Sequence, residues 1–207
     1  MNEFEFQERF ERLTDHQPFP WQTRLFLEYF DQERLPAAVD VPTGLGKTAV
    51  AVLWLIAVLV GRRLPRRLVY VVDRRAVVDQ ATAFVEKLRE RLPEAERFPI
   101  STLRGQHIDN REWLDDPARP AIIVGTVDML GSRLLFSGYG VSRKMRAYPA
   151  GLLGADTLVV LDEAHLVPPF EQLLEAVESG AGDCWPEAST DLARDRKSTR
   201  LNSSHYS

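Results

Sequence analysis

Cysteine is nearly absent from this 207-residue chain, in which Cys184 is the single one. A lone cysteine excludes an internal disulfide and a cysteine-rich zinc site, and it fits a reducing cytoplasm. Long apolar runs are also missing: the longest, Ala49 to Val60, has twelve residues, whereas a membrane span needs about 18. The N-terminus is acidic where an export signal would be basic and then apolar. We therefore expect a cytoplasmic protein without a membrane partner.

A large excess of charge of one sign is missing as well. The formal net charge is -4, so the whole molecule has no overall attraction to nucleic acid. Residues 61–111 are locally basic, with 12 basic and 7 acidic side chains. This segment indicates either a phosphate-facing edge or solvated helix faces. Hydrophobic residues at 44% and charged residues at 27% are close to globular averages, which excludes a disordered, collagenous or coiled-coil chain.

Short apolar runs alternate with helical patterns along the chain. We expect strands at residues 37–41, 68–72, 100–103, 121–124 and 157–161. We expect helices at residues 21–30, 47–60, 76–91, 128–136 and 169–178. Strands that are apolar throughout are buried on both faces, so the pattern predicts an α/β fold in which helices cover both faces of a parallel sheet.

The segment between the first expected strand and the helix after it has the pattern of a phosphate-binding loop. It reads Pro42-Thr43-Gly44-Leu45-Gly46-Lys47-Thr48. Glycines such as Gly44 and Gly46 let backbone N–H groups face an anion, and the helix N-terminus adds its dipole. Lys47 can reach the β and γ phosphates of ATP, and Thr48 can hold Mg²⁺. Val41 replaces a glycine of the general pattern, which is typical of helicase loops; the alternative is a glycine-rich turn with a surface lysine.

A second polar group follows the last expected strand, where the chain reads Leu161-Asp162-Glu163-Ala164-His165. The carboxyl ends of strands in an open α/β sheet line the ligand crevice, so this group should face the same edge as Lys47. Asp162 would hold the Mg²⁺, and Glu163 would orient and deprotonate the attacking water. His165 is a candidate coupler on the γ-phosphate side. The alternative is a helix cap with a surface histidine.

Upstream of the loop, Phe19-Pro20-Trp21-Gln22 is a candidate adenine-binding segment. Gln22 could read the adenine edge through paired hydrogen bonds while an aromatic ring stacks on the base. The alternative makes Gln22 an exposed helix position and Trp21 a core residue. We divide the chain into an N-terminal helical, adenine-recognising segment at 1–36 and an ATP-binding domain at 37–180.

The loop and the Asp-Glu-Ala-His box, in this order, resemble the first RecA-like domain of superfamily 2 helicases, which are P-loop NTPases, of the DEAH type. Other segments resemble the CRISPR-associated helicase-nuclease of type I interference; they are Val71–Gln80, Ser101–Gly105, Gly125–Leu130, Gly131–Phe136 and Leu161–Leu166. The resemblance covers about residues 18–178. It implies ATP hydrolysis coupled to translocation on single-stranded DNA in antiviral defense, with a CRISPR RNA-guided surveillance complex as partner.

The resemblance also implies a set of nucleic-acid contacts, and the residues concerned are Arg74, Arg75, Arg104, Thr126 and Arg133. For each arginine, an ordinary surface position is an equal alternative, because phosphate-positioning contacts leave little sequence signature.

Parts of the resembled family are not visible in this sequence. Its nuclease needs a His-Asp pair of metal ligands, and none of the four histidines in this sequence is followed by aspartate. Its second RecA-like domain, with the arginine finger, should begin beyond Glu178. We therefore interpret the chain as an N-terminal fragment, an ATP-dependent helicase by resemblance that has little turnover alone.

The end of the chain is expected to stay outside the fold. Residues 181–207 are interpreted as a disordered or artefactual tail, because Arg194–Ser207 is poor in large apolar side chains and resembles a translated adaptor-like sequence.

Two alternative functions stay open. One is a motor subunit of a restriction-type helicase, which usually lacks the Asp73-Arg74-Arg75 triplet. The other is a nucleotide-binding scaffold without turnover, which would not need Glu163.

Overall fold

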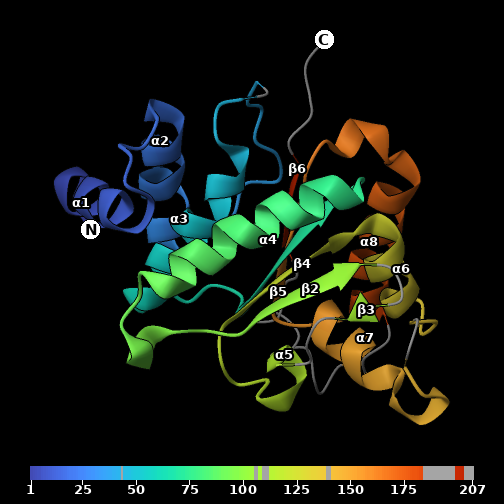
Figure 1. The fold of residues 1–207 in the computed structure, drawn as a ribbon. Helices are drawn as coiled ribbons and strands as arrows, with labels where there is room; N and C mark the ends of the chain where they lie inside the picture. Colours follow the sequence, from blue (N-terminus) through green and yellow to red (C-terminus); the bar gives the residue numbers. More distant parts are fainter. Residues whose placement is uncertain (43, 105–106, 109–111, 139–140, 184–198, 203–207) are drawn as a thin grey trace.

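The structure is a computed structural model that describes the chain except residues 43, 105–106, 109–111, 139–140, 184–198 and 203–207. One mixed sheet runs through it in the strand order β3-β2-β4-β1-β5-β6 (Figure 1). The strands are β1 (Arg67–Val72), β2 (Ile100–Arg104), β3 (His107–Ile108), β4 (Ala121–Thr126), β5 (Thr157–Leu161) and β6 (Thr199–Asn202). Every pairing is parallel except that of β2 with β3.

Helices cover both faces of this sheet. They are α1 (Glu3–Thr14), α2 (Pro20–Glu28), α3 (Val50–Leu59), α4 (Arg75–Glu90), α5 (Glu112–Asp115), α6 (Val127–Leu134), α7 (Ala147–Gly154) and α8 (Pro168–Asp183). Alternate residues of each strand enter two separate apolar clusters, so Leu68 and Tyr70 pack with α1–α4 while Val69 and Val71 pack with α5–α8. The predicted parallel α/β fold with helices on both faces is confirmed.

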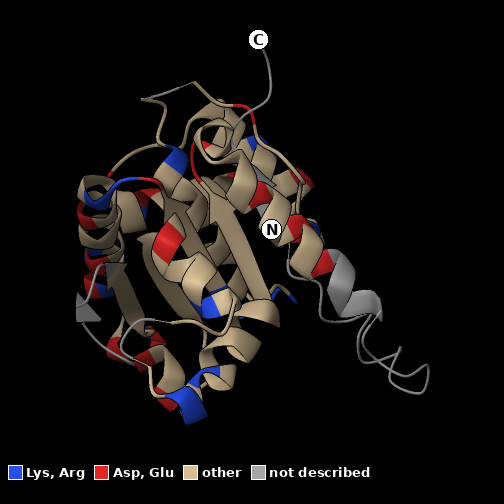
Figure 2. Cartoon of the chain, turned by 90° about the vertical axis from the view of Figure 1, so that its right-hand side faces the viewer, with Lys and Arg blue, Asp and Glu red and all other residues tan. Residues whose placement is uncertain are grey.

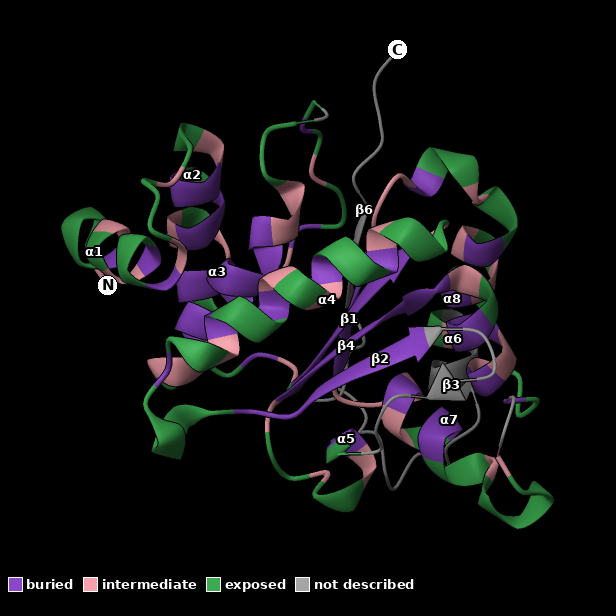
Figure 3. Ribbon diagram, in the orientation of Figure 1, coloured by how far each residue is buried: buried purple, intermediate pink, exposed green. Residues whose placement is uncertain are grey.

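The longest apolar run of the sequence forms the core helix α3. Residues 50–57 are all buried, as Figure 3 shows, and the Trp54 indole donates to the Pro65 carbonyl at 2.8 Å. Helices α1 and α2 lie against α3, and between them the rings of Phe6 and Phe26 stack 4.3 Å apart. None of the helices in the described ranges is long and apolar enough to cross a bilayer.

The strand expected at residues 37–41 is wrong. Only Ala38 makes an isolated bridge there, although Val41 is buried. A strand needs a neighbour that accepts its backbone hydrogen bonds. The open edge of β5 is instead paired with β6, in the register Val159 to Arg200. Residues 37–41 therefore run as an extended connection toward the loop.

The C-terminal segment also differs from the expectation of an unpacked tail. Helix α8 continues to Asp183, and β6 lies within the tail, parallel to β5. An unpaired strand edge exposes a row of N–H and C=O groups that any extended segment can satisfy. The rest of the predicted tail lies outside the described residues.

Arg67, at the start of β1, connects this strand to the segments that precede β4 and β5. Arg67 is 4% exposed, and its side chain donates to the carbonyl oxygens of Leu152, Pro117 and Ala155 at 3.1, 3.1 and 2.7 Å. The carboxylate of Asp156 lies 3.8 Å away. Because β1 lies between β4 and β5, these hydrogen bonds of Arg67 hold the start of a central strand of the sheet in place.

We predict that Arg67→Met lowers the free energy of unfolding by about 3–5 kcal/mol, because it leaves buried carbonyl oxygens without donors. Urea denaturation measures this loss of free energy, provided that the dependence of the free energy on urea concentration is the same in the variant and the wild type. The matched control is Arg66→Met: the Arg66 side chain is 54% exposed in its pair with Asp156. The control should cost at most about 1 kcal/mol. Equal losses in the two variants would contradict this role of Arg67.

Candidate functional site

The loop at residues 42–48 is shaped by two glycines with left-handed backbone angles. Gly44 has φ +86° and Gly46 has φ +71°. A Cβ at Gly46 would lie 3.1 Å from the Gln22 amide nitrogen and 3.5 Å from the Phe19 ring, so both angle and space require glycine there. Lys47–Ala49 follows as a 3-10 turn that continues into α3. Thr43 lies outside the described residues.

The segment upstream of the loop braces it. The Trp21 indole donates to the Leu45 carbonyl at 3.1 Å, and the Gln22 amide donates to the Gly46 carbonyl at 3.2 Å. The Gln22 side-chain oxygen accepts from the Phe19 N–H at 2.8 Å, and Gln22 is 2% exposed. Both polar ends of Gln22 make hydrogen bonds within the chain, so Gln22 braces the loop in this structure, and its adenine-reading role stays a prediction. Because Gln22 is 2% exposed, the alternative that it occupies an exposed helix position is wrong.

An ion pair joins the loop to the Asp-Glu-Ala-His box. Lys47 Nζ lies 2.8 Å from Glu163 Oε1, with the two side chains 14% and 28% exposed. The other carboxylate oxygen of Glu163 lies 3.5 Å from His165 Nδ1. Glu163 itself has a left-handed backbone, with φ 51°, which turns the chain directly after β5. The predicted meeting of Lys47 with the box is thus observed, and Glu163 competes with any phosphate for the Lys47 ammonium.

Tyr70 connects the two predicted Mg²⁺ ligands. Its hydroxyl donates to Asp162 Oδ2 at 2.9 Å. The Thr48 side chain lies near the same hydroxyl and opposes the rise in the pKa of Tyr70. Burial, followed by the charge of Asp162, raises the pKa of Tyr70 above its ordinary range, so the phenol stays a donor at neutral pH. The sequence pattern predicted Tyr70 only as a strand residue. The available signal was a polar-tipped aromatic in an otherwise apolar strand.

The residues around Tyr70 fit a magnesium ion that arrives with a nucleotide. Oxygen atoms of Thr48 and Asp162 are gathered around one phenol oxygen. In the part of the chain that the structure describes, no group of three or more His, Cys, Asp or Glu side chains forms a metal site by itself. Mg²⁺ typically takes one or two protein oxygens and completes its shell with phosphate and water. The donor set therefore suits Mg²⁺ bound together with phosphates.

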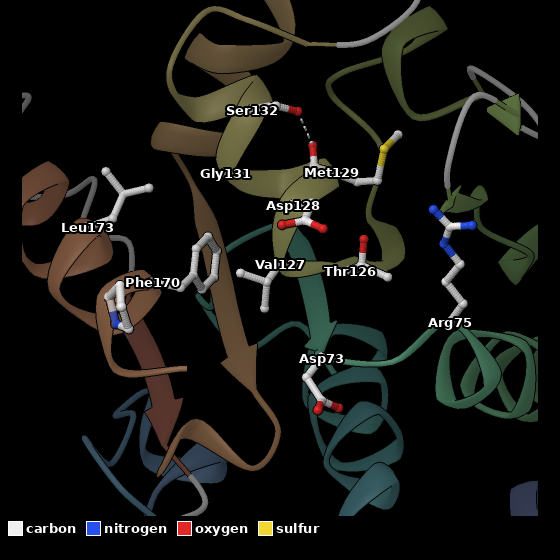
Figure 4. A pocket seen from close by; sticks show the side chains of 11 residues that line it. Asp73, Arg75, Thr126, Val127, Asp128, Met129, Gly131, Ser132, Phe170 and Leu173 are labelled. Atoms are coloured by element: carbon white, nitrogen blue, oxygen red, sulfur yellow. Dashed lines mark hydrogen bonds between the residues drawn. The ribbon is translucent and has the colours of Figure 1, made fainter. Parts of the chain in front are cut away.

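A pocket of about 780 Å³ opens beyond the ends of β1 and β4. It is lined by Asp73, Arg75, Thr126, Val127, Asp128, Met129, Gly131, Ser132, Pro169, Phe170 and Leu173. Figure 4 shows Phe170 and Leu173 on the α8 side and Arg75 on the opposite side. The pocket thus has one apolar wall and one polar wall.

The predicted nucleic-acid residues are only partly brought together. Arg75 and Thr126 line the pocket, and Arg74 is exposed beside it, with its guanidinium 3.4 Å from Asp73. Arg104 ends β2, and its side chain is outside the described part. Arg133 is 2% exposed and donates to the carbonyl of its own helix neighbour Met129 at 2.9 Å. The expected strand contact of Arg133 is corrected, because the guanidinium lies inside the fold.

A RecA-like sheet with a glycine loop facing an acidic box defines a nucleotide-binding domain. The sequence model of the family described as DEAD/DEAH box helicase matches residues 20–179, and the chain belongs to this family. The resemblance to superfamily 2 helicases is thereby confirmed, and this domain is a helicase ATP-binding domain of the DEAD/DEAH type.

Among solved structures, the chain is similar to a DEAD-box helicase, Mss116, bound to ssRNA and UDP-BeF. The sequence identity is 15% and the TM-score 0.57, over 95% of this chain and 43% of that chain. The chain therefore spans less than half of that helicase. No curated protein sequence matches the chain.

The ion pair yields a prediction about nucleotide affinity. Glu163→Gln frees the Lys47 ammonium from a carboxylate, and a partly exposed pair is worth about 0–1 kcal/mol, so ATP should bind equally well or up to about 5-fold tighter. Lys47→Ala should abolish detectable binding. Calorimetry with Mg·ATP checks both variants. Weaker binding by Glu163→Gln than by the wild type, or unchanged binding by Lys47→Ala, would contradict the site.

Proposed function

We propose that this chain is the ATP-binding motor domain of a helicase that hydrolyses ATP while moving along a single nucleic-acid strand. The observation that carries the proposal is the 2.8 Å contact between Lys47 and Glu163, because it places the phosphate-binding loop and the acidic box in one site. A scaffold that only held nucleotide would need Lys47 but no carboxylate at this position.

The proposed chemistry follows from how these side chains are arranged. Lys47 exchanges Glu163 for the β and γ phosphates. The released Glu163 carboxylate then accepts the proton of the attacking water, and His165 remains beside its second oxygen. Thr48 and Asp162 would hold Mg²⁺, which supplies charge neutralisation and orientation of the phosphate oxygens. The brace from Gln22 and Trp21 keeps the loop backbone in place while the phosphates exchange.

Full turnover is proposed to need more than this chain. Developing charge on the transferred phosphoryl group is met by an arginine finger in many such enzymes, worth about 10³ to 10⁵ in rate. The resembled helicases carry it on a second RecA-like domain, and the chain spans 43% of the solved helicase it resembles. We propose that the isolated chain binds ATP and hydrolyses it slowly.

The pocket beyond β1 and β4 is the proposed path of the nucleic-acid strand. Arg75 begins α4 with Arg74 directly before it, and Thr126 precedes α6, so two helix N-termini and two guanidinium groups adjoin the same opening. Helix α8 carries acidic side chains at Glu171, Glu175 and Glu178, and Figure 2 shows acidic residues in red along the helices of this side of the molecule. Because they repel phosphates, the backbone of the strand should run on the arginine side.

The finer identity of the motor is also a proposal. The segments around Asp73-Arg74-Arg75 and Gly125–Leu130 support a CRISPR-associated helicase that acts on single-stranded DNA in antiviral defense with an RNA-guided surveillance complex. The solved helicase with a similar fold binds ssRNA, so the choice between DNA and RNA is a matter for measurement. The cytoplasmic location expected from the single cysteine stays a prediction.

We predict weak, salt-dependent binding of single-stranded DNA. For single strands the logarithm of affinity falls by about 0.7 for each phosphate contact per log unit of salt, so Arg75→Ala should reduce that slope by about 0.7. The matched control Arg12→Ala removes the same charge from an exposed position on α1, which lies across the molecule from α6 and α8 (Figure 1). Fluorescence anisotropy over a salt series measures both slopes. Equal slopes for the two variants would remove the pocket from the proposed path.

A further inference from the structure

We propose that Tyr70 is a positioning residue that holds the two magnesium-binding side chains, Thr48 and Asp162, in register with one another. The inference rests on the proposed function, since it concerns the ion that accompanies ATP at this site. It adds a role for β1, a strand that contributes no residue to the phosphate-binding loop or to the acidic box.

The position of the phenol is fixed by the sheet. Tyr70 pairs with Val160 in the parallel register of β1 and β5, and the Asp162 N–H donates to the Val71 carbonyl at 2.9 Å. Both Tyr70 and Val160 belong to the apolar cluster on the α3 face. The Tyr70 side chain is 2% exposed, so it has little freedom to choose another partner. Strand pairing therefore determines where its hydroxyl lies.

The hydroxyl bridges two elements that have no backbone connection. It donates to Asp162 Oδ2 at 2.9 Å, directly after β5. The Thr48 side chain, in the turn that leads into α3, lies near the same hydroxyl. A phenol has one proton to donate and lone pairs to accept with, so a single oxygen serves both partners.

A purely structural role would be filled equally well by phenylalanine. The neighbours of Tyr70 in β1 are Val69 and Val71, and all six residues of the strand are buried. Burying a hydroxyl in such a strand costs free energy unless it is hydrogen-bonded, and here both partners are predicted metal ligands. Groups that orient metal-binding carboxylates commonly change metal affinity about 10- to 100-fold when removed.

Tyr70→Phe tests the inference, because it keeps the ring and deletes only the oxygen. A fluorescent ATP analogue is titrated into the full chain with excess Mg²⁺ and again with EDTA. We expect the affinity in EDTA to change less than about 2-fold and the gain in affinity from Mg²⁺ to fall about 10- to 100-fold. The control is Tyr148→Phe, which deletes a phenol that donates to the Leu114 carbonyl at 2.8 Å. It should leave both affinities unchanged.

A double-mutant cycle separates positioning from a general packing effect. If Tyr70 acts through Asp162, then Tyr70→Phe should add nothing to the loss of Mg²⁺ dependence already caused by Asp162→Asn. Melting temperatures of all variants report on folding independently. Additive losses, or a Mg²⁺ gain in Tyr70→Phe equal to that of Tyr148→Phe, would overturn the inference while ATP binding by the wild type still stood. If the wild-type chain bound no nucleotide, the proposed function would fall and the inference with it.

Discussion

The central position of β1 between β4 and β5 is the constraint on which the site depends. Its register places Val71 beside Gly125 on one side and Leu161 on the other, so the three strands end at the same edge. The residues that follow them emerge there together, with Asp73 and Thr126 toward the pocket and Asp162 toward the loop. Buried Arg67 fixes the opposite end of the same strand. The groups proposed for catalysis and for strand binding are thus arranged by one set of backbone pairings.

Two side-chain contacts lie at this edge of the sheet, and they differ in how easily a ligand can replace them. The first contact is the partly exposed ion pair of Lys47 with Glu163. A phosphate can replace the Glu163 carboxylate beside Lys47 at a low cost in free energy, because such pairs are weak. The second contact is the part-buried hydrogen bond to Asp162 from Tyr70, which is itself 2% exposed. The first suits exchange with a ligand, and the second suits permanent alignment. Their combination lets the site open to ATP without losing its geometry.

The fold class, the main strands and the loop with its acidic box were predictable, because each is a local pattern. Helix α7 was missed, since Pro149 and Gly151 interrupt its helical signal, and the strand at 37–41 was wrong because strand formation depends on a partner that local sequence does not reveal. Arg133 and Gln22 look like surface groups in the sequence, yet both are 2% exposed. Burial of a polar side chain is decided by tertiary packing, which a linear pattern does not contain.

The central claim is that the loop at Lys47 and the box at Glu163 form one nucleotide site. Hydrogen–deuterium exchange with and without a slowly hydrolysed ATP analogue and Mg²⁺ tests it directly, because the two segments are 116 residues apart in the sequence. The account predicts that peptides covering residues 44–50 and 160–166 gain protection together and at the same nucleotide concentration. Protection confined to the loop, with the box unchanged at saturation, would contradict it.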